Sequence, residues 1–226
     1  MPRVTIRALL FDFDGVLWNS EAIGYQAWHE TFASFGEEFP LEVFATYVGS
    51  LDSPDPMDEL ERRLGRVVDR DAAQERRRAR LTELENSLEP LPGVEDYLRE
   101  ARARGLATAI VSTNDADWIS EGLALMGIDE DWRFVESADG DRARAKPLPT
   151  LYLAALERLE LRPDEAIAIE DSPNGIRAAK DAGLFCLAVP TEITSGMDLA
   201  AADLVVASLA DLPLAELIRL AEARGA

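Results

Sequence analysis

Two aspartates, separated by one residue, follow an apolar run near the start of the chain. The run covers residues 8–11, and Asp12, Asp14 and Gly15 come directly after it. On a strand, residues i and i+2 point the same way, so both carboxylates can face one point. Two anions at one point repel, which calls for a cation or a shared proton. A glycine there lets the backbone turn sharply beside a ligand, although a solvated strand end with an ordinary turn gives the same pattern.

Three later stretches carry further polar groups. Ser112 and Thr113 follow a second apolar run, and Glu170 and Asp171 follow a third. Lys146 lies between them in Ala145-Lys146-Pro147. Because the carboxyl ends of parallel strands meet at one edge of a sheet, we expect these groups to gather there.

The gathered residue types suit the chemistry of phosphate. Carboxylates such as those of Asp12, Asp14 and Asp171, together with Glu170, are hard oxygen ligands that suit Mg²⁺. Hydroxyl groups, backbone donors and one compact cation are what a phosphoryl group needs. A carboxylate beside a metal can attack phosphorus, and a second carboxylate can act as acid and base. The set therefore predicts phosphoryl transfer.

The order of elements predicts an α/β fold with an insertion. Residues 19–88 predict helices only, at about 21–36 after a Ser20 cap, 41–48, 57–64 and 71–88. Residues 89–226 predict strands at 106–111, 134–135, 166–169, 185–189 and 204–206, alternating with helices at 95–104, 117–126, 151–159, 175–182 and 214–223. This alternation predicts a Rossmann-like, three-layer parallel-sheet core from residues 1–18 and 89–226, with 19–88 as a helical cap domain inserted after the first strand.

Composition narrows the class of protein. The 226 residues carry 23 basic and 43 acidic side chains, a net charge of −20. Such acidity argues against nucleic acid and anionic membrane surfaces as partners. The single cysteine, Cys186, allows no intrachain disulfide, and no signal peptide or membrane-spanning run is visible. Composition therefore predicts a cytoplasmic protein. Its expected partner, from the phosphate chemistry above, is a small phosphorylated metabolite, and the sequence does not decide between a monomer and a dimer.

The four stretches together resemble the haloacid dehalogenase superfamily, in particular members with a helical cap such as β-phosphoglucomutase and phosphoglycolate phosphatase. Residues 11–16, FDFDGV, resemble its first motif, and 111–113, VST, the second. Lys146-Pro147 resembles the third, and 170–175, EDSPNG, the fourth. The four motifs stand in order and cover nearly the whole chain.

The resemblance implies a role for each of these residues. Asp12 would be the nucleophile that forms an aspartyl-phosphate, and Asp14 would protonate the leaving oxygen and then activate water. Magnesium would be held by four residues: Asp12, the backbone carbonyl of Asp14, Glu170 and Asp171. The phosphoryl group would be held by three: Ser112, Thr113 and Lys146.

Details of the motifs favour hydrolysis of a phosphate ester. The dehalogenases lack the second acid of the first motif, and the phosphonate-cleaving members need a cap lysine, whereas residues 19–88 contain none. The mutase has a histidine in the first cap helix and a Lys-Gly-x-x-Arg loop; here Gly24 and residues 48–52 stand there, without basic residues. We expect a Mg²⁺-dependent phosphatase acting on a small phosphomonoester, such as a sugar phosphate. A β-phosphoglucomutase-type mutase is the alternative, and a non-catalytic phosphate-binding relative is a second one.

Four further residues are candidates for contact with substrate. Arg77 or Arg78, within an arginine-rich helix, could reach an anionic substrate, or both could belong to a solvated helix face. Trp18 could line the pocket or pack between cap and core. Asn114 could contact substrate or cap a helix.

Overall fold

The structure is a computed structural model, and it describes residues 5–46, 55–87 and 89–224. The chain divides into two compact units. Residues 1–18 and 89–226 form the first unit, and residues 19–88 form the second.

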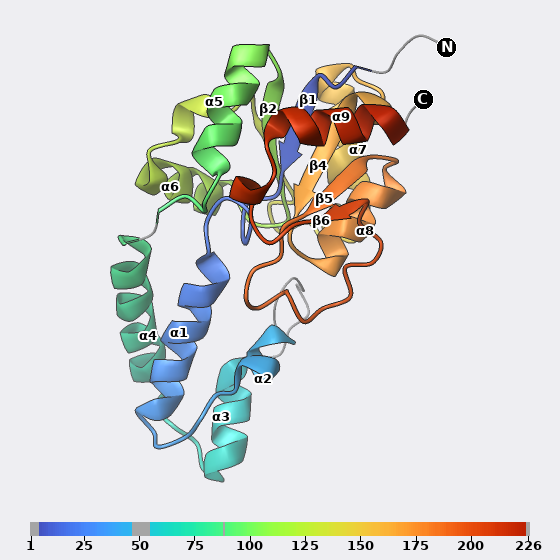
Figure 1. Ribbon diagram of the computed structural model, residues 1–226. Helices are drawn as coiled ribbons and strands as arrows, with labels where there is room; N and C mark the ends of the chain where they lie inside the picture. The colour runs from blue at the N-terminus through green and yellow to red at the C-terminus, as the bar shows by residue number, and fades with distance from the viewer. Residues whose placement is uncertain (1–4, 47–54, 88, 225–226) are drawn as a thin grey trace. The chain divides into compact units, whose positions relative to one another are not determined.

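A parallel sheet is the centre of the first unit (Figure 1). Its six described strands are β1 (Ala8–Phe11), β2 (Ala107–Ser112), β3 (Val135–Ser137), β4 (Ala166–Glu170), β5 (Phe185–Ala188) and β6 (Leu204–Val205). Their order is β3-β2-β1-β4-β5-β6, and every neighbouring pair is parallel. Strand β1 lies in the middle, so polar groups that follow it have β2 on one side and β4 on the other.

Helices cover both faces of this sheet. They are α5 (Val94–Arg104), α6 (Ala116–Met126), α7 (Thr150–Leu159), α8 (Pro173–Asp181) and α9 (Leu214–Arg224), with short 3₁₀ turns at Asp129–Asp131, Pro163–Glu165 and Leu209–Asp211. Helices α7 and α8 pack on each other, as do α5 and α9. The predicted three-layer α/β architecture is confirmed.

The sequence of β1 explains its central place. All four of its side chains are buried, so both faces of the strand need cover. Ala8 and Leu10 pack into the core beneath α7 and α8, where Tyr152 and Ile176 also lie. A continuous apolar run, rather than an alternating one, is what a strand buried on both faces requires.

The second unit contains helices only, within the residues that the structure describes. They are α1 (Ser20–Ala33), α2 (Leu41–Ala45), α3 (Pro56–Leu64) and α4 (Arg70–Glu85), and α1 packs along α4. Its core includes the stacked rings of Phe32 and Phe39, whose centroids are 4.3 Å apart. The predicted Ser20 cap is wrong: Asn19 is the N-cap, and its side-chain oxygen accepts the N–H of Ala22.

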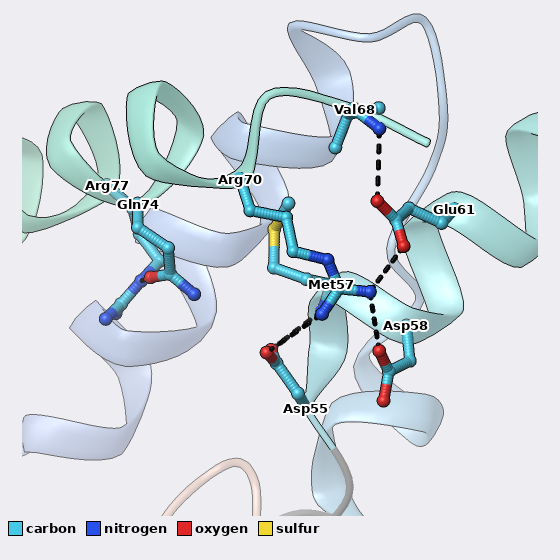
Figure 2. Close-up of polar contacts among 8 residues, drawn as sticks. All are labelled: Asp55, Met57, Asp58, Glu61, Val68, Arg70, Gln74 and Arg77. Carbon is cyan, nitrogen blue, oxygen red and sulfur yellow. Dashed lines mark hydrogen bonds and ion pairs between the residues drawn. The ribbon is translucent and has the colours of Figure 1, made fainter. Parts of the chain in front are cut away.

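One arginine fixes the turn between α3 and α4 (Figure 2). The Arg70 guanidinium donates to Asp58 Oδ1 at 2.6 Å and to Glu61, and it lies 3.6 Å from Asp55 Oδ2. Asp55 also caps α3 by accepting the N–H of Met57. The charge of Arg70 is therefore paired with acidic side chains of the same unit. The loop at residues 48–52, compared above with the mutase loop, lies outside the described residues.

Cys186 is buried in β5, as expected for a small core residue. In the described part of the chain, no helix is both long and apolar enough to cross a membrane.

Candidate active site

The site is built where β1 ends. Asp12 is the first residue after β1, and its N–H still bonds to the carbonyl oxygen of Ile169 in β4 at 2.9 Å. Glu170 is the last residue of β4, and Ser112 is the last of β2. Since both strands are parallel neighbours of β1, the three side chains leave the sheet at the same edge.

A buried ammonium group joins two of these carboxylates. Lys146 Nζ lies 2.8 Å from Asp12 Oδ1 and 2.7 Å from Glu170 Oε1. The side chain of Glu170 is fully buried, and those of Lys146 and Asp12 are 5% and 12% exposed. Buried charges require partners of opposite charge, so this ion-pair cluster fixes the relative positions of the three side chains.

The environment shifts the proton affinities of this cluster. Burial, followed by repulsion from Asp12, raises the pKa of Glu170 well above its usual range. Burial acts to lower the pKa of Lys146, but the two adjacent carboxylates outweigh it and hold that pKa above its ordinary value. Lys146 is therefore a permanent cation there.

Two neighbours fit closely around Glu170. The hydroxyl of Tyr152 in α7 donates to Glu170 Oε1 at 2.5 Å. Gly175, in the first turn of α8, lies against the same carboxylate: a Cβ there would be 1.8 Å from Oε2. Among the described residues, Oε2 is buried without a hydrogen-bond partner. Position 175 must therefore be glycine if Glu170 is to keep this place.

The acids are arranged as a cation site. Asp12, Glu170 and Asp171 each offer one carboxylate oxygen, and the three oxygens lie within 4.8 Å of one another. Lys146 brings one positive charge to this group of three carboxylates. The three oxygens and the unpartnered Oε2 of Glu170 fit Mg²⁺, a hard divalent cation that takes oxygen ligands. Gly15, with φ +77°, leaves space for the Asp171 side chain, because a Cβ at position 15 would lie 2.3 Å from Asp171 Oδ2.

Asp14 points to a different set of partners. Its Oδ2 accepts from Asn114 Nδ2 at 2.6 Å, and its Oδ1 accepts from the indole Nε1 of Trp118 at 3.1 Å. The backbone at Asp14 also bridges to Trp18, whose carbonyl oxygen accepts the N–H of Gly15. A metal role for the Asp14 carbonyl stays a prediction.

The expected phosphate-binding residues have local roles in the structure. Ser112 Oγ accepts the N–H of Asn114 at 3.1 Å. Thr113 Oγ1 accepts the N–H of Lys146 at 3.2 Å, which ties the lysine loop to the end of β2. The Lys146-Pro147 peptide bond in this loop is cis. Contact of these hydroxyls with phosphate remains a prediction.

Two further candidates for contact with substrate, Trp18 and Asn114, have different neighbours. The Trp18 side chain is 1% exposed and packs between Phe13 and Trp118, both of the same unit, and a contact of Trp18 with substrate stays a prediction. The expectation that Asn114 caps a helix is wrong, because α6 takes Asp115 as its N-cap and the Asn114 amide binds Asp14.

The two cap arginines also differ from each other. Arg77 is half-buried in α4, with its guanidinium 4.6 Å from the centroid of the Trp28 ring, whereas Arg78 is exposed. Burial, and then the charge of Arg78, lowers the pKa of Arg77.

Sequence reasoning missed three residues that hold the acids: Trp118, Tyr152 and Thr194. Thr194 is fully buried in the segment after β5, and its hydroxyl lies 3.4 Å from Asp171 Oδ2. Tyr152 and Trp118 carried one usable signal, since a tyrosine or tryptophan within a core helix needs a partner for its polar atom. No pattern in the sequence identified which partner.

Replacing Gly175 with alanine tests the close fit around Glu170. Gly175→Ala should destabilise the protein by about 1–3 kcal/mol, because the new methyl group forces Glu170 to move. Gly24→Ala is the matched control: the nearest atom to its Cβ would be Phe44 Cζ at 3.7 Å, and alanine favours helix α1. Urea unfolding measures both. Equal stability of Gly175→Ala and the wild type would contradict the described packing.

Replacing Lys146 tests the charge balance. Lys146→Met leaves two buried carboxylates without their ammonium group, which should lower the free energy of unfolding in EDTA by about 3–5 kcal/mol. Mg²⁺ should then raise the melting temperature more in the variant than in the wild type, because it replaces the missing positive charge.

The matched control is Lys180→Met. Lys180 Nζ pairs with Asp203 Oδ2 at 2.6 Å and is likewise mostly buried, with 20% of its side chain exposed. Its replacement should lower stability without changing the increment that Mg²⁺ gives. An equal Mg²⁺ increment in the two lysine variants would contradict the claim that Mg²⁺ replaces the charge of Lys146, and the absence of any increment in both would rule out the cation site.

Comparison with known proteins agrees with this geometry. Residues 6–183 match the family model of haloacid dehalogenase-like hydrolases. YhcW of Bacillus subtilis (strain 168) is 35% identical over 213 residues, which are 94% of this chain and 96% of that protein. Validoxylamine A 7′-phosphate phosphatase of Streptomyces hygroscopicus subsp. limoneus is 29% identical over 206 residues, 91% of this chain and 95% of that protein.

A solved structure extends the comparison to the fold. A variant of CbbY from Rhodobacter sphaeroides, in complex with xylulose-(1,5)bisphosphate, is similar with a TM-score of 0.71 and 29% identity, covering 94% of this chain and 99% of that chain. The family match, the relatives and the arrangement of acids around Lys146 agree. The chain belongs to the haloacid dehalogenase-like hydrolase family and is a phosphatase of that family.

Proposed function

We propose that this phosphatase depends on Mg²⁺ and hydrolyses a small phosphomonoester through an aspartyl-phosphate on Asp12. One observation supports this most strongly: Asp12 lies at the edge of the sheet beside a buried lysine and within 4.8 Å of two further acids. A nucleophilic carboxylate needs its own charge and that of the phosphate offset, and this cluster supplies the groups to do so.

In this proposal each residue of the site has one chemical role. The Asp12 carboxylate attacks phosphorus, the P–O ester bond breaks, and the leaving oxygen takes a proton from Asp14. A water oxygen then attacks the phosphorus, Asp14 takes its proton, and the bond to Asp12 breaks. Lys146 and Ser112 hold the transferred group. Magnesium, bound by Asp12, Glu170, Asp171 and the Asp14 carbonyl, would supply charge neutralisation for the phosphoryl oxygens.

Residues 19–88 serve, in this proposal, as a cap that sets substrate choice, and the substrate is a sugar phosphate or a similar polyol phosphate. The names of two relatives support that class: one is complexed with a sugar bisphosphate, and the other is named for a validoxylamine phosphate. Arg77 is our candidate for the cap residue that contacts the anionic substrate. It is half-buried, unlike Arg78, and Gln74 and Trp28 hold its guanidinium in place.

The direct test is hydrolysis of a panel of sugar phosphates with Mg²⁺ present. The wild type should release inorganic phosphate without a bisphosphate activator, and EDTA should abolish turnover. Asp12→Asn should lower kcat/KM on the order of 10³-fold or more, because the amide cannot act as the nucleophile.

Two other outcomes would contradict the proposal. An isomerised sugar phosphate, formed only with a bisphosphate activator, would establish a mutase instead. Phosphate binding without turnover on any ester, including aryl phosphates, would identify a non-catalytic relative.

The cap proposal is tested by a pair of neighbouring substitutions. Arg77→Met should raise KM about 10-fold, equivalent to about 1.4 kcal/mol, with kcat changed less than about 3-fold. Arg78→Met is the control, because Arg78 is exposed on the same helix, and it should leave both constants unchanged. Equal constants for Arg77→Met and the wild type would remove Arg77 from the substrate site.

A further inference from the structure

We propose that Trp118 is a positioning residue for Asp14, and that its indole N–H determines which oxygen of Asp14 exchanges protons with the reactants. The inference rests on the proposed function, in which Asp14 gives a proton to the leaving oxygen and later takes one from water. It concerns a residue that neither the motifs nor the charge pattern of the sequence singled out.

The two oxygens of Asp14 have donors of different kinds. Oδ1 accepts from Trp118 Nε1, and Oδ2 accepts from Asn114 Nδ2. Trp118 is half-buried in the first turn of α6, whereas Asn114 is exposed in the loop between β2 and α6. An indole N–H donates and cannot accept, so it holds its carboxylate oxygen in one orientation.

The Trp118 donor is held by an aromatic row that begins beside Asp14 itself. The Trp118 ring lies 5.3 Å from the Trp18 ring, and the Trp18 ring lies 5.4 Å from that of Phe13, the residue before Asp14. Gly122, also in α6, makes room for this row: a Cβ there would lie 2.6 Å from Phe13 Cζ and 2.9 Å from Trp18 Cζ2. Packed rings at these separations leave Nε1 little freedom.

The two donors therefore have different roles in the reaction. Trp118 keeps its hydrogen bond to Oδ1 throughout and fixes the plane of the Asp14 carboxylate. The exposed Asn114 amide can swing away, so that Oδ2 becomes the oxygen that meets the leaving group and then the attacking water. Misplacing an acid–base group by about 1 Å can cost a factor of 10², so a fixed donor has a measurable effect.

Trp118→Phe tests the inference, because it keeps a packed six-membered ring and removes only the five-membered ring of the indole, which carries the N–H donor. With an alkyl phosphate, kcat should fall about 10- to 100-fold while KM changes less than about 3-fold. With 4-nitrophenyl phosphate, whose leaving group needs no proton, transfer to Asp12 should continue while hydrolysis of the phosphoenzyme slows. The variant should therefore show a burst of one nitrophenol per enzyme.

Trp132→Phe is the matched control. Trp132 also packs against a phenylalanine ring, that of Phe11, and its buried Nε1 has no hydrogen-bond partner among the described residues. Its replacement should leave kcat unchanged for both substrates. Asn114→Ala should lower kcat less than Trp118→Phe does.

Three results would overturn the inference without touching the proposed function. They are an unchanged kcat in Trp118→Phe, an equal loss on both phosphates without a burst, and a larger kcat loss in Asn114→Ala than in Trp118→Phe. Persistence of turnover in Asp12→Asn is the separate result that would remove the proposed function itself.

Discussion

The buried ion-pair cluster around Lys146 is the constraint on which the rest of the site depends. Two carboxylates, Asp12 and Glu170, share one ammonium group almost without access to water. Such an arrangement is stable only if every neighbour fits it, which explains the Tyr152 hydroxyl on Glu170 and the glycine at position 175. The parallel pairing of β1 with β4 makes the cluster possible, because it brings both carboxylates to one edge.

The sequence predicted the sheet and the main acids because both depend on local patterns. Apolar runs followed by Asp12 or Glu170 mark strand ends, and parallel strands bring their ends together. Tyr152 and Trp118 could not be assigned, because their partners lie 18 and 104 residues away and no spacing rule links them. The predicted cap of the first helix was wrong for a similar reason. Asn19 and Ser20 are both good capping residues, and the choice between them depends on the path of the backbone.

The arginines of the helical unit differ in their partners. Arg70 is bound by three acids, and Arg80 bonds to Glu30 and Glu83. Arg77 instead lies over Trp28, where burial removes part of its hydration. No ion pair joins Arg77 to an acid among the described residues, although Asp55 and Glu85 act on it from a distance.

The most direct measurement of the central claim is chemical identification of the phosphorylated residue. The enzyme is mixed with Mg²⁺ and a substrate from the panel, quenched in acid, reduced with borohydride and digested for mass spectrometry. Borohydride converts an aspartyl-phosphate to homoserine, so the account predicts homoserine at position 12 alone, and none in samples without substrate. Unmodified Asp12 in enzyme quenched during rapid turnover, or homoserine at another aspartate, would contradict it.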